Sequence, residues 1–436
     1  MKVLVSAYAC YPPSTERCTE EDKKMADGEA LLGWNLIGQI ARSHDVWVMT
    51  QARNRRGIER VLQREGKSAL KAVRFTYVDF PGWPEGLWEN QISNHFYYYF
   101  WQILAFFRAR ALHRIVHFDL AHHLTFANDW MPSFIGAFLP VPFIWGPIGG
   151  GHITPKALRQ EYTWSQRLGD YYRMAVQWIG RNVLMSRRRC QKRAKAILVC
   201  NYETKHRVPA RWQDKVHLFP VNSLSLEDFG EPLVNHLEDD VFTILTVGRL
   251  RQLKGFGLAI KAFAMFTQKY PSSKLEIIGD GPDERRLRRL ARELQIEDRI
   301  LFSTWLPRNE VFRKMAKCDV FLFPSFREGG GAVIVEAMAN AKPVIGLDTG
   351  GPALHIQPEW GIKVTPTSYD QILSELSSAL QKLFLDGNLR HRLGEAARRR
   401  AMDYYLLDRL GERLEKIYQE ALLPTDKSIS LNRNQP

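Results

Sequence analysis

The segment Asp319-Val-Phe-Leu-Phe-Pro-Ser-Phe-Arg-Glu328-Gly-Gly-Gly-Ala-Val-Ile-Val-Glu336-Ala-Met-Ala339 combines three backbone preferences. Residues 320–323 are apolar, β-branched or aromatic, and a proline follows them, which is typical of a central strand in a parallel sheet. The three glycines then allow the backbone to approach a ligand closely. The apolar run after them predicts a helix. The segment therefore predicts a strand, a glycine loop and a helix in succession.

Two carboxylates, Glu328 and Glu336, flank this glycine loop. A helix that opens near Gly331 presents unpaired N–H groups and the positive end of its dipole, which suits an anionic phosphate. Carboxylates that do not face the phosphate can accept hydrogen bonds from ribose or sugar hydroxyl groups. The pattern predicts a site for a polyol beside a phosphate. A helix with a solvated acidic first turn is the alternative for this spacing taken by itself.

Strands and helices alternate along both halves of the chain. The predicted strands lie at 2–7, 45–50, 73–78, 242–247, 274–278 and 300–303. Predicted helices lie between them, at about 29–42, 58–64 and 258–266. This alternation favours parallel sheets covered by helices. We therefore expect an α/β protein with domains at 1–222 and 241–402, a linker at 223–240, a C-terminal helix at 403–423 and a polar tail at 424–436.

Composition limits the class of protein. The chain has 436 residues, of which 45% are hydrophobic and 25% charged, as in globular proteins with more than one domain. Its five cysteines are scattered without C-x-x-C spacing, so they predict neither a disulfide framework nor a zinc site and favour a reducing cytosol. The net charge of +14 attracts anions. Because no nucleic-acid-binding module accompanies it, anionic lipid or a phosphorylated substrate ranks above nucleic acid.

Two features bear on membranes. No segment reaches the roughly 20 apolar residues of a spanning helix, and the apolar start of the chain is too short for a signal peptide. The run Phe96-Tyr-Tyr-Tyr-Phe-Trp-Gln-Ile-Leu-Ala-Phe-Phe107, followed by arginines, could lie in a membrane interface. Burial against a sheet is the alternative, and it is favoured because apolar residues surround the whole helix. Basic residues also cluster between Arg181 and Lys195.

Arg249 and Lys254 follow the predicted strand at 242–247. A guanidinium fork and a compact ammonium at a strand end can bind two linked phosphates. The chain lacks the G-x-x-x-x-G-K-[ST] loop of P-loop nucleotide sites and lacks a D-x-D pair for a divalent ion. We therefore expect protein charge, without a metal or other cofactor, to neutralise a diphosphate and to stabilise it as a leaving group.

The combined motifs resemble the family 4 retaining glycosyltransferases of GT-B fold. The resemblance is carried by Val247-Gly-Arg249-Leu with Lys254-Gly, Ile278-Gly-Asp-Gly-Pro282, Cys318–Ser325, Glu328 to Glu336-Ala-Met-Ala, and Pro343-Val-Ile with Gly350-Gly-Pro. The N-terminal Ser6-Ala-Tyr-Ala-Cys10 and Trp145-Gly-Pro-Ile-Gly-Gly resemble one branch. The resemblance to the family implies two Rossmann-like domains that face a central cleft, with C-terminal helices that cross back to the first domain.

The family resemblance implies roles for individual residues. Glu328 would bind donor-sugar hydroxyls, Glu336 the ribose, Arg249 and Lys254 the diphosphate, and Leu306 the nucleobase through its backbone. The implied donor-binding set is Gly248, Arg249, Lys254, Gly279, Leu306, Glu328, Gly329, Gly330, Gly331, Ala332 and Glu336. The implied reaction transfers a sugar from a nucleoside diphosphate to an acceptor hydroxyl with retained configuration and without a metal.

The N-terminal domain would bind the acceptor. The candidates lie at strand ends and in the first loop: Gly28, Glu29, His122, His123, Thr125, Trp145, Gly149 and Gly150. The chain departs from the family because Leu31 replaces a loop glycine and because no histidine is found at the end of the strand Trp145-Gly-Pro147. His122 or His123 could take the role of that missing histidine on the acceptor side. The candidate catalytic residues are then Arg249, Lys254 and Glu328 together with His122 or His123. Buried, satisfied histidines are the equal alternative.

The sequence therefore predicts a cytoplasmic glycosyltransferase, peripheral on the inner face of a membrane, that serves cell-surface polysaccharide or glycolipid synthesis. Its predicted partners are a nucleotide sugar, a saccharide or lipid-linked saccharide acceptor and an anionic membrane surface, but not nucleic acid. A nucleotide-sugar epimerase of the same architecture is one alternative. A non-catalytic nucleotide-sugar-binding subunit is the other.

Overall fold

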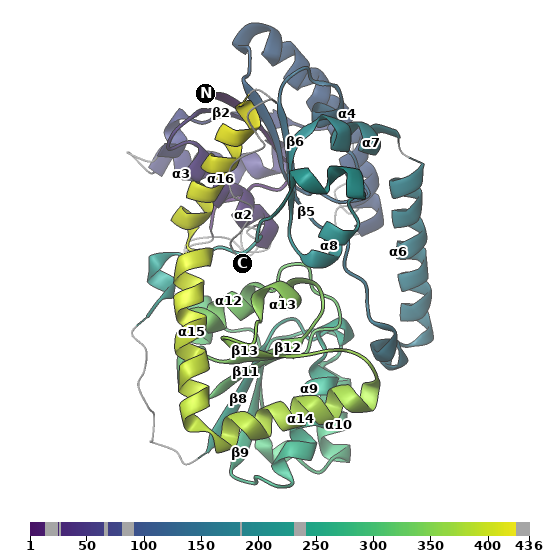
Figure 1. Cartoon of the computed structure of the whole chain (residues 1–436), viewed down its shortest axis with the longest axis vertical. Helices are drawn as coiled ribbons and strands as arrows, with labels where there is room; N and C mark the ends of the chain where they lie inside the picture. The colour runs from purple at the N-terminus through teal and green to yellow at the C-terminus, as the bar shows by residue number, and fades with distance from the viewer. Residues whose placement is uncertain are drawn as a thin grey trace.

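Two parallel sheets, one in each half of the chain, organise the protein (Figure 1). The computed structural model describes residues 1–13, 25, 28–64, 69–80, 91–183, 185–230 and 241–423. Residues 14–24, most of the predicted linker and the polar tail at 424–436 lie outside the described residues.

The first sheet has seven strands in the order β3-β2-β1-β4-β5-β6-β7. They are β1 (Lys2–Ala7), β2 (Asp45–Gln51), β3 (Arg74–Val78), β4 (Leu120–Thr125), β5 (Phe143–Ile148), β6 (Ala194–Val199) and β7 (Val216–Leu218). Its helices are α2 (Gly28–Ile40), α3 (Arg55–Arg64), α4 (Gln91–Val116), α5 (Phe134–Phe138), α6 (Trp164–Asn182), α7 (Met185–Arg193) and α8 (Tyr202–His206). Strand order reverses between β1 and β4, as in doubly wound folds.

The second sheet has six strands in the order β10-β9-β8-β11-β12-β13. They are β8 (Phe242–Val247), β9 (Ser273–Ile278), β10 (Ile300–Ser303), β11 (Val320–Phe323), β12 (Val344–Leu347) and β13 (Gly361–Val364). Its helices are α9 (Phe256–Thr267), α10 (Glu284–Glu293), α11 (Arg308–Lys317), α12 (Ala332–Ala339), α13 (Gly350–His355), α14 (Tyr369–Leu385) and α15 (Gly387–Tyr405). Here the order reverses between β8 and β11, and β11 is a fully buried strand of the kind that its apolar run predicts.

The last helix, α16 (Leu407–Leu422), crosses back to the first domain, as the yellow end of the chain in Figure 1 shows. Its apolar side, which includes Leu410, Leu414 and Tyr418, is buried in the core of the first domain. Burial of one such side chain contributes roughly 1.5 to 3 kcal/mol, which is a sufficient reason for the crossing. The predicted start of this helix at 403 falls inside α15, and the break between the two helices lies at Leu406.

The crossing point pairs two distant segments. Leu224, which follows the first domain, receives a hydrogen bond from Leu407 N (2.9 Å) and donates one to Tyr405 O (2.8 Å). The chain therefore passes between the domains twice at one place, and the two passages are bonded to each other. A further link lies on the opposite side, where Leu158 and Tyr162 pack into the core of the second domain.

The aromatic helix α4 is buried on one side and exposed on the other. Tyr97, Tyr98 and Trp101 are buried against the sheet, whereas Phe96 and Phe107 are exposed on the outer side. Burial is therefore correct for one side of the helix only. Among the described residues, no helix combines the length and the apolar character that crossing a membrane would require.

Candidate functional site

The strongest cluster of predicted site residues lies where the strand order of the second sheet reverses. Arg249 and Lys254 come from the loop after β8, and Glu328 comes from the loop after the neighbouring strand β11. In doubly wound sheets, ligands bind in the crevice at the carboxyl ends of strands at such a reversal. Sequence alone could not pair these two loops, because they are more than 70 residues apart and the pairing of β8 with β11 joins them.

Lys254 and Glu328 form an ion pair in which Nζ donates to Oε2. Both side chains keep part of their surface open, with 30% of Lys254 and 16% of Glu328 exposed. Arg249 is exposed, and its side chain makes no hydrogen bond or ion pair within the described part of the chain. Within the described part of the chain, Arg249 is therefore a free cation, whereas a carboxylate balances the charge of Lys254. A diphosphate that bound here would take over Lys254 and release Glu328 to accept hydrogen bonds from a hydroxyl group.

The glycine loop begins a helix as its sequence predicts. Gly331 caps α12 with φ +80°, a left-handed conformation that glycine adopts without strain. Gly330 has a different reason to lack a side chain. A methyl group at this position would lie 2.8 Å from Val221 Cγ2 and 3.0 Å from Asn222 Oδ1 of the first domain. This glycine therefore permits close contact between the domains.

Side chains outside the predicted set hold the carbonyl groups of this loop. Asn201 Nδ2 donates to Gly329 O (3.3 Å), and Asn222 Nδ2 donates to Gly330 O (3.1 Å). His355 Nε2 lies 2.6 Å from the same Gly330 oxygen. Since a carbonyl can only accept, Nε2 carries the proton. The sequence missed these residues because isolated Asn and His residues carry no local signal of a partner that lies 25 to 128 residues away.

The rest of the His355 ring is also occupied. Its Nδ1 lies 2.6 Å from the hydroxyl of Tyr405, which is the last residue of α15 and adjoins the crossing point at Leu406. Burial lowers the pKa of His355 to about 4, so the ring is neutral at pH 7 and its Nδ1 accepts a hydrogen bond from the Tyr405 hydroxyl. The imidazole of His355 thus connects the carbonyl of Gly330, in the glycine loop, to the point where the chain passes between the domains.

Glu336 projects from α12 toward Arg308, whose Nε donates to its Oε1 at 3.2 Å. Arg308 also binds Asp228 and so connects α11, α12 and the segment before β8. Burial raises the pKa of Glu336, and the neighbouring Arg308 opposes that shift. The ribose role implied for Glu336 remains a prediction. A ribose hydroxyl would have to share this carboxylate with Arg308.

The other donor-side candidates line the same edge. Gly248 and Gly279 follow neighbouring strands, and a methyl group at Gly279 would lie 2.0 Å from Gly248 O. Leu306 follows β10 and packs, partly buried, against the hydrophobic core of the second domain, while the adjacent Trp305 is 61% exposed. Ala332 is exposed at the first position of α12. These residues lie at the ends of β8, β9, β10 and β11, as the GT-B resemblance implies.

His122 and His123 do not form an acceptor wall, because both belong to the buried strand β4. His122 Nε2 donates to Gly146 O (2.6 Å), and its Nδ1 accepts from Tyr418 of α16 (2.7 Å). His123 Nε2 lies 2.7 Å from the Tyr98 hydroxyl. The alternative of a buried, satisfied histidine describes His122, which helps to hold the crossing helix. His123 is also buried, but its Nδ1 has no hydrogen-bond partner among the described residues.

Thr125 and Trp145 are also core residues. Thr125 Oγ1 exchanges hydrogen bonds with the backbone of Ala9, and Trp145 is 1% exposed. Gly28 and Glu29 instead lie exposed at the start of α2, where Glu29 accepts a hydrogen bond from Phe126 N. The sequence could not separate these cases because strand ends look alike until the register of the sheet is known.

Gly149 and Gly150 come directly after β5, as predicted. Gly149 N donates to Ala127 O (3.0 Å), and Gly150 O accepts from Arg181 (3.2 Å). They therefore lie in the loop that leads to His152.

His152 is the residue that the sequence interpretation overlooked. It comes five residues after Pro147 and directly after the glycine run 149–151, so the expectation of no histidine at this strand end was too narrow. A methyl group at Gly329 would lie 3.4 Å from His152 Cε1, which places the ring beside the glycine loop. Its Nδ1 is buried and has no hydrogen-bond partner among the described residues.

The electrostatic surroundings keep His152 neutral. Burial lowers its pKa to about 4, and the nearby cations Arg327, Arg173, Arg207 and Lys254 act in the same direction. A neutral imidazole with one unused nitrogen can donate to or accept from a hydroxyl group. His152 thus places a neutral imidazole of the first domain beside Gly329 of the second domain.

Acid should destabilise the folded chain because several histidines are buried in the neutral form. Burial lowers the pKa of His122 to about 4, of His123 to about 3 and of His355 to about 4. Between pH 6.5 and 4 the unfolded chain therefore binds more protons than the folded one. We expect the free energy of unfolding, measured by urea denaturation, to fall by about 1.4 kcal/mol per pH unit for each such histidine. Equal values at pH 7.5 and 5.0 would contradict this expectation.

A pocket of about 450 Å³ lies between the two domains beside this site. It is lined from the first domain by Tyr162, Gln166, Gly169 and Asp170, and from the second by Arg251, Gln252, Leu253, Pro282, Asp283 and Arg327. Within the described ranges, no group of three or more His, Cys, Asp or Glu side chains is arranged to hold a metal ion.

Sequence comparison finds that the second domain is similar to a known family. A sequence model of the family described as glycosyl transferases group 1 matches residues 232–400. The D-inositol 3-phosphate glycosyltransferase of Corynebacterium jeikeium is 32% identical over 182 residues, which cover 40% of this chain and 42% of that protein. An N-acetylgalactosaminyltransferase of Campylobacter jejuni that acts on a diphospho-undecaprenol-linked sugar is 30% identical over 182 residues, 41% of this chain and 47% of that protein. The chain spans less than half the length of these curated relatives.

Solved structures resemble the whole chain. Sucrose-phosphate synthase from Thermosynechococcus elongatus has a TM-score of 0.61 at 18% identity and covers 96% of this chain and 98% of its own. HepE of Anabaena, solved in complex with UDP, has a TM-score of 0.59 at 16% identity, with 96% and 100% covered. WaaG, a glycosyltransferase of lipopolysaccharide biosynthesis, has a TM-score of 0.56 at 19% identity, with 95% and 99% covered. The chain therefore has the GT-B fold, and its residues 232–400 match the sequence model of the glycosyl transferases group 1.

Proposed function

We propose that this chain is a glycosyltransferase that moves a sugar from a nucleoside diphosphate to an acceptor hydroxyl, in the synthesis of a glycolipid or surface polysaccharide. The observation that carries the proposal is the contact of Lys254 with Glu328 across the reversal between β8 and β11. It brings together a group for the diphosphate and a group for the sugar. The family match over residues 232–400 and the nucleotide bound by HepE support the donor class.

The residues divide the chemistry as follows. Arg249 and Lys254 bind the diphosphate and stabilise the negative charge that it gains as the bond from its oxygen to the sugar breaks. Glu328 and His152 hold sugar hydroxyl groups from the two sides of the cleft. The acceptor oxygen forms the new bond to the same carbon with retained configuration, and its proton passes to the leaving diphosphate. The carbonyls of the glycine loop, held by Asn201, Asn222 and His355, orient the sugar relative to the acceptor.

A panel of nucleotide sugars tests this function and its rivals. The purified chain would be incubated with each donor, with and without a saccharide or lipid-linked saccharide acceptor, and the products identified by mass spectrometry and NMR. Transfer that requires the acceptor, with the anomeric configuration retained, is the expected result. Interconversion of the sugar without an acceptor would show an epimerase. Nucleotide binding without any turnover across the panel would show a binding subunit.

Metal removal gives a separate prediction. Because Arg249 and Lys254 lie together in the loop after β8, protein charge is available to neutralise the diphosphate. We expect the rate of transfer to stay unchanged after treatment with a chelator and after addition of magnesium or manganese. Loss of activity in the chelator that either ion restores would show that these two cations are insufficient.

A further inference from the structure

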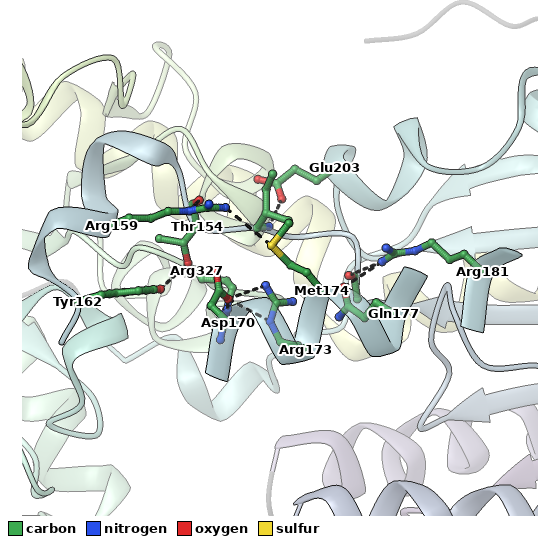
Figure 2. A network of polar contacts seen from close by, with 12 residues as sticks. Thr154, Arg159, Tyr162, Asp170, Arg173, Met174, Gln177, Arg181, Glu203 and Arg327 are labelled. Atoms are coloured by element: carbon green, nitrogen blue, oxygen red, sulfur yellow. Dashed lines mark hydrogen bonds and ion pairs between the residues drawn. The ribbon is translucent and has the colours of Figure 1, made fainter. Parts of the chain in front are cut away.

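Helix α6 is oriented with its polar side toward the protein. Asp170 pairs with Arg173 (3.0 Å) and with Arg327 of the second domain. Farther along the same side, Arg181 bonds Asp129 (2.7 and 3.0 Å) and Gln177 Oε1 (3.1 Å). Figure 2 shows the side chains of one polar network, among them Asp170, Arg173, Gln177, Arg181 and Arg327 together with Thr154, Tyr162 and Glu203. The inner side of α6 is therefore already satisfied by hydrogen bonds and ion pairs.

The outer side of the same helix is apolar and aromatic. Its exposed residues are Trp164 (78%), Leu168 (55%), Tyr171 (62%), Tyr172 (51%), Trp178 (62%) and Ile179 (50%). They recur with the period of a helix and so form one stripe. A surface helix of a globular protein normally has the opposite arrangement, with the apolar stripe in the core. An exposed stripe of this kind marks a surface that contacts another phase or molecule.

The charge around this stripe has one sign. Residues 164–195 contain nine arginine or lysine residues and a single acidic residue, Asp170. Asp170 is buried and already paired with two arginines. Exposed basic residues lie along and beyond the stripe at Arg167, Arg188, Arg189, Lys192 and Lys195. The surface therefore combines tryptophan, tyrosine and aliphatic side chains with a positive flank.

The same side of the molecule continues over neighbouring helices. Helix α7 contacts α6, and α5 contacts both α7 and α4. Figure 1 shows α4, α6 and α7 on one flank of the molecule. Among the residues of these helices, Phe96, Phe100 and Phe107 of α4 and Phe138 of α5 are exposed. We call the outer side of α6 together with the exposed basic residues of α7 the α6–α7 face.

We propose that the α6–α7 face docks on an anionic phospholipid bilayer, with the aromatic stripe in the interface and the basic residues over the headgroups. Tryptophan and tyrosine prefer the level of the headgroups, and arginine and lysine beside them are attracted to anionic lipid. A second copy of this face is a poor partner because its cations would oppose the same cations. Since Asp170 on the inner side holds Arg327 next to Glu328, docking would place the bilayer beside the sugar-binding loop.

Vesicle sedimentation with the full chain tests this surface without any sugar donor, so its outcome is independent of the proposed enzymatic activity. One variant replaces the two outer tryptophans, Trp164→Gln with Trp178→Gln. A second reverses exposed charges, Arg188→Glu with Lys192→Glu and Lys195→Glu. Matched controls make the same kinds of change on the second domain: Leu301→Gln with Leu385→Gln, and Arg285→Glu with Arg289→Glu and Arg292→Glu. All of these side chains are exposed, so each variant should keep the wild-type melting temperature.

The wild-type chain should sediment with vesicles of phosphatidylcholine and phosphatidylglycerol, less with phosphatidylcholine alone, and less at high salt. Each α6–α7 variant should lower the partition coefficient by about tenfold or more, while the second-domain controls stay close to the wild type. If the charge-reversal control on the second domain lowered the partition coefficient as much as the charge reversal on the α6–α7 face, vesicle binding would depend on net charge alone. That result would overturn the proposal. Absence of vesicle binding, or a dimer in solution that the tryptophan variant dissociates, would overturn it as well.

Discussion

Replacing Glu328 by glutamine is expected to lower kcat/KM for sugar transfer by about 100- to 1,000-fold, while the affinity for the free nucleoside diphosphate stays the same or rises. The reason is the ion pair that Glu328 makes with Lys254. A donor diphosphate must displace this carboxylate from Lys254, and the neutral amide of glutamine competes less for the ammonium group. The same amide accepts a hydrogen bond from a sugar hydroxyl less strongly than a carboxylate does.

Lys254→Ala gives the complementary result. Removal of the ammonium group should weaken binding of the nucleoside diphosphate, whereas Glu328→Gln should not. Titration calorimetry with the diphosphate and steady-state kinetics with the nucleotide sugar separate the two effects. Glu276→Gln is a matched control, because Glu276 also pairs with a lysine of this domain, Lys314, at 2.6 Å but lies on β9. If Glu328→Gln weakened diphosphate binding as much as Lys254→Ala does, the division of roles would be wrong.

Replacing His152 by alanine is expected to lower kcat by about 100-fold or more with little change in diphosphate affinity. His152 lies beside Gly329 of the glycine loop, and its buried Nδ1 has no hydrogen-bond partner among the described residues. The residues proposed to bind the phosphates are Arg249 and Lys254, not His152. Because its pKa is lowered to about 4, the ring stays neutral over the usual range of assay pH. The part of the rate that depends on His152 should therefore be constant from pH 8 to pH 6 and decline only as the pH approaches 4.

His217→Ala is the control for this prediction. His217 lies on β7, and burial lowers its pKa as well, but it is not part of the cleft. Both substitutions remove a partly buried imidazole, so both can reduce stability, and melting temperatures would measure that effect. Only His152→Ala should reduce turnover at a temperature where all three proteins are folded. Equal turnover of the two variants would remove His152 from the site.

Much of the fold follows from local sequence. The strands β1, β2, β8, β9, β10 and β11 were predicted within one or two residues, because short apolar runs bounded by turn residues form buried strands wherever they occur. The start of α12 at the glycine loop was also correct, since Gly331 adopts a conformation that few other residues tolerate. The inner polar side of α6 was not foreseen. Its partners Asp129 and Arg327 belong to distant segments.

The donor side and the opposite wall of the cleft differ in how much local information they contain. Arg249, Lys254, Glu328 and the glycines form compact runs at strand ends, so the sequence by itself determined the α/β alternation and the residues offered to a phosphate and a polyol. Tertiary structure decided which of these residues meet. It placed Lys254 against Glu328, turned His122 and His123 into core residues, brought His152 to Gly329 and left the apolar side of α6 exposed. The physical reason is that strand order and register determine burial and contact between distant residues, and the local pattern of residues contains neither.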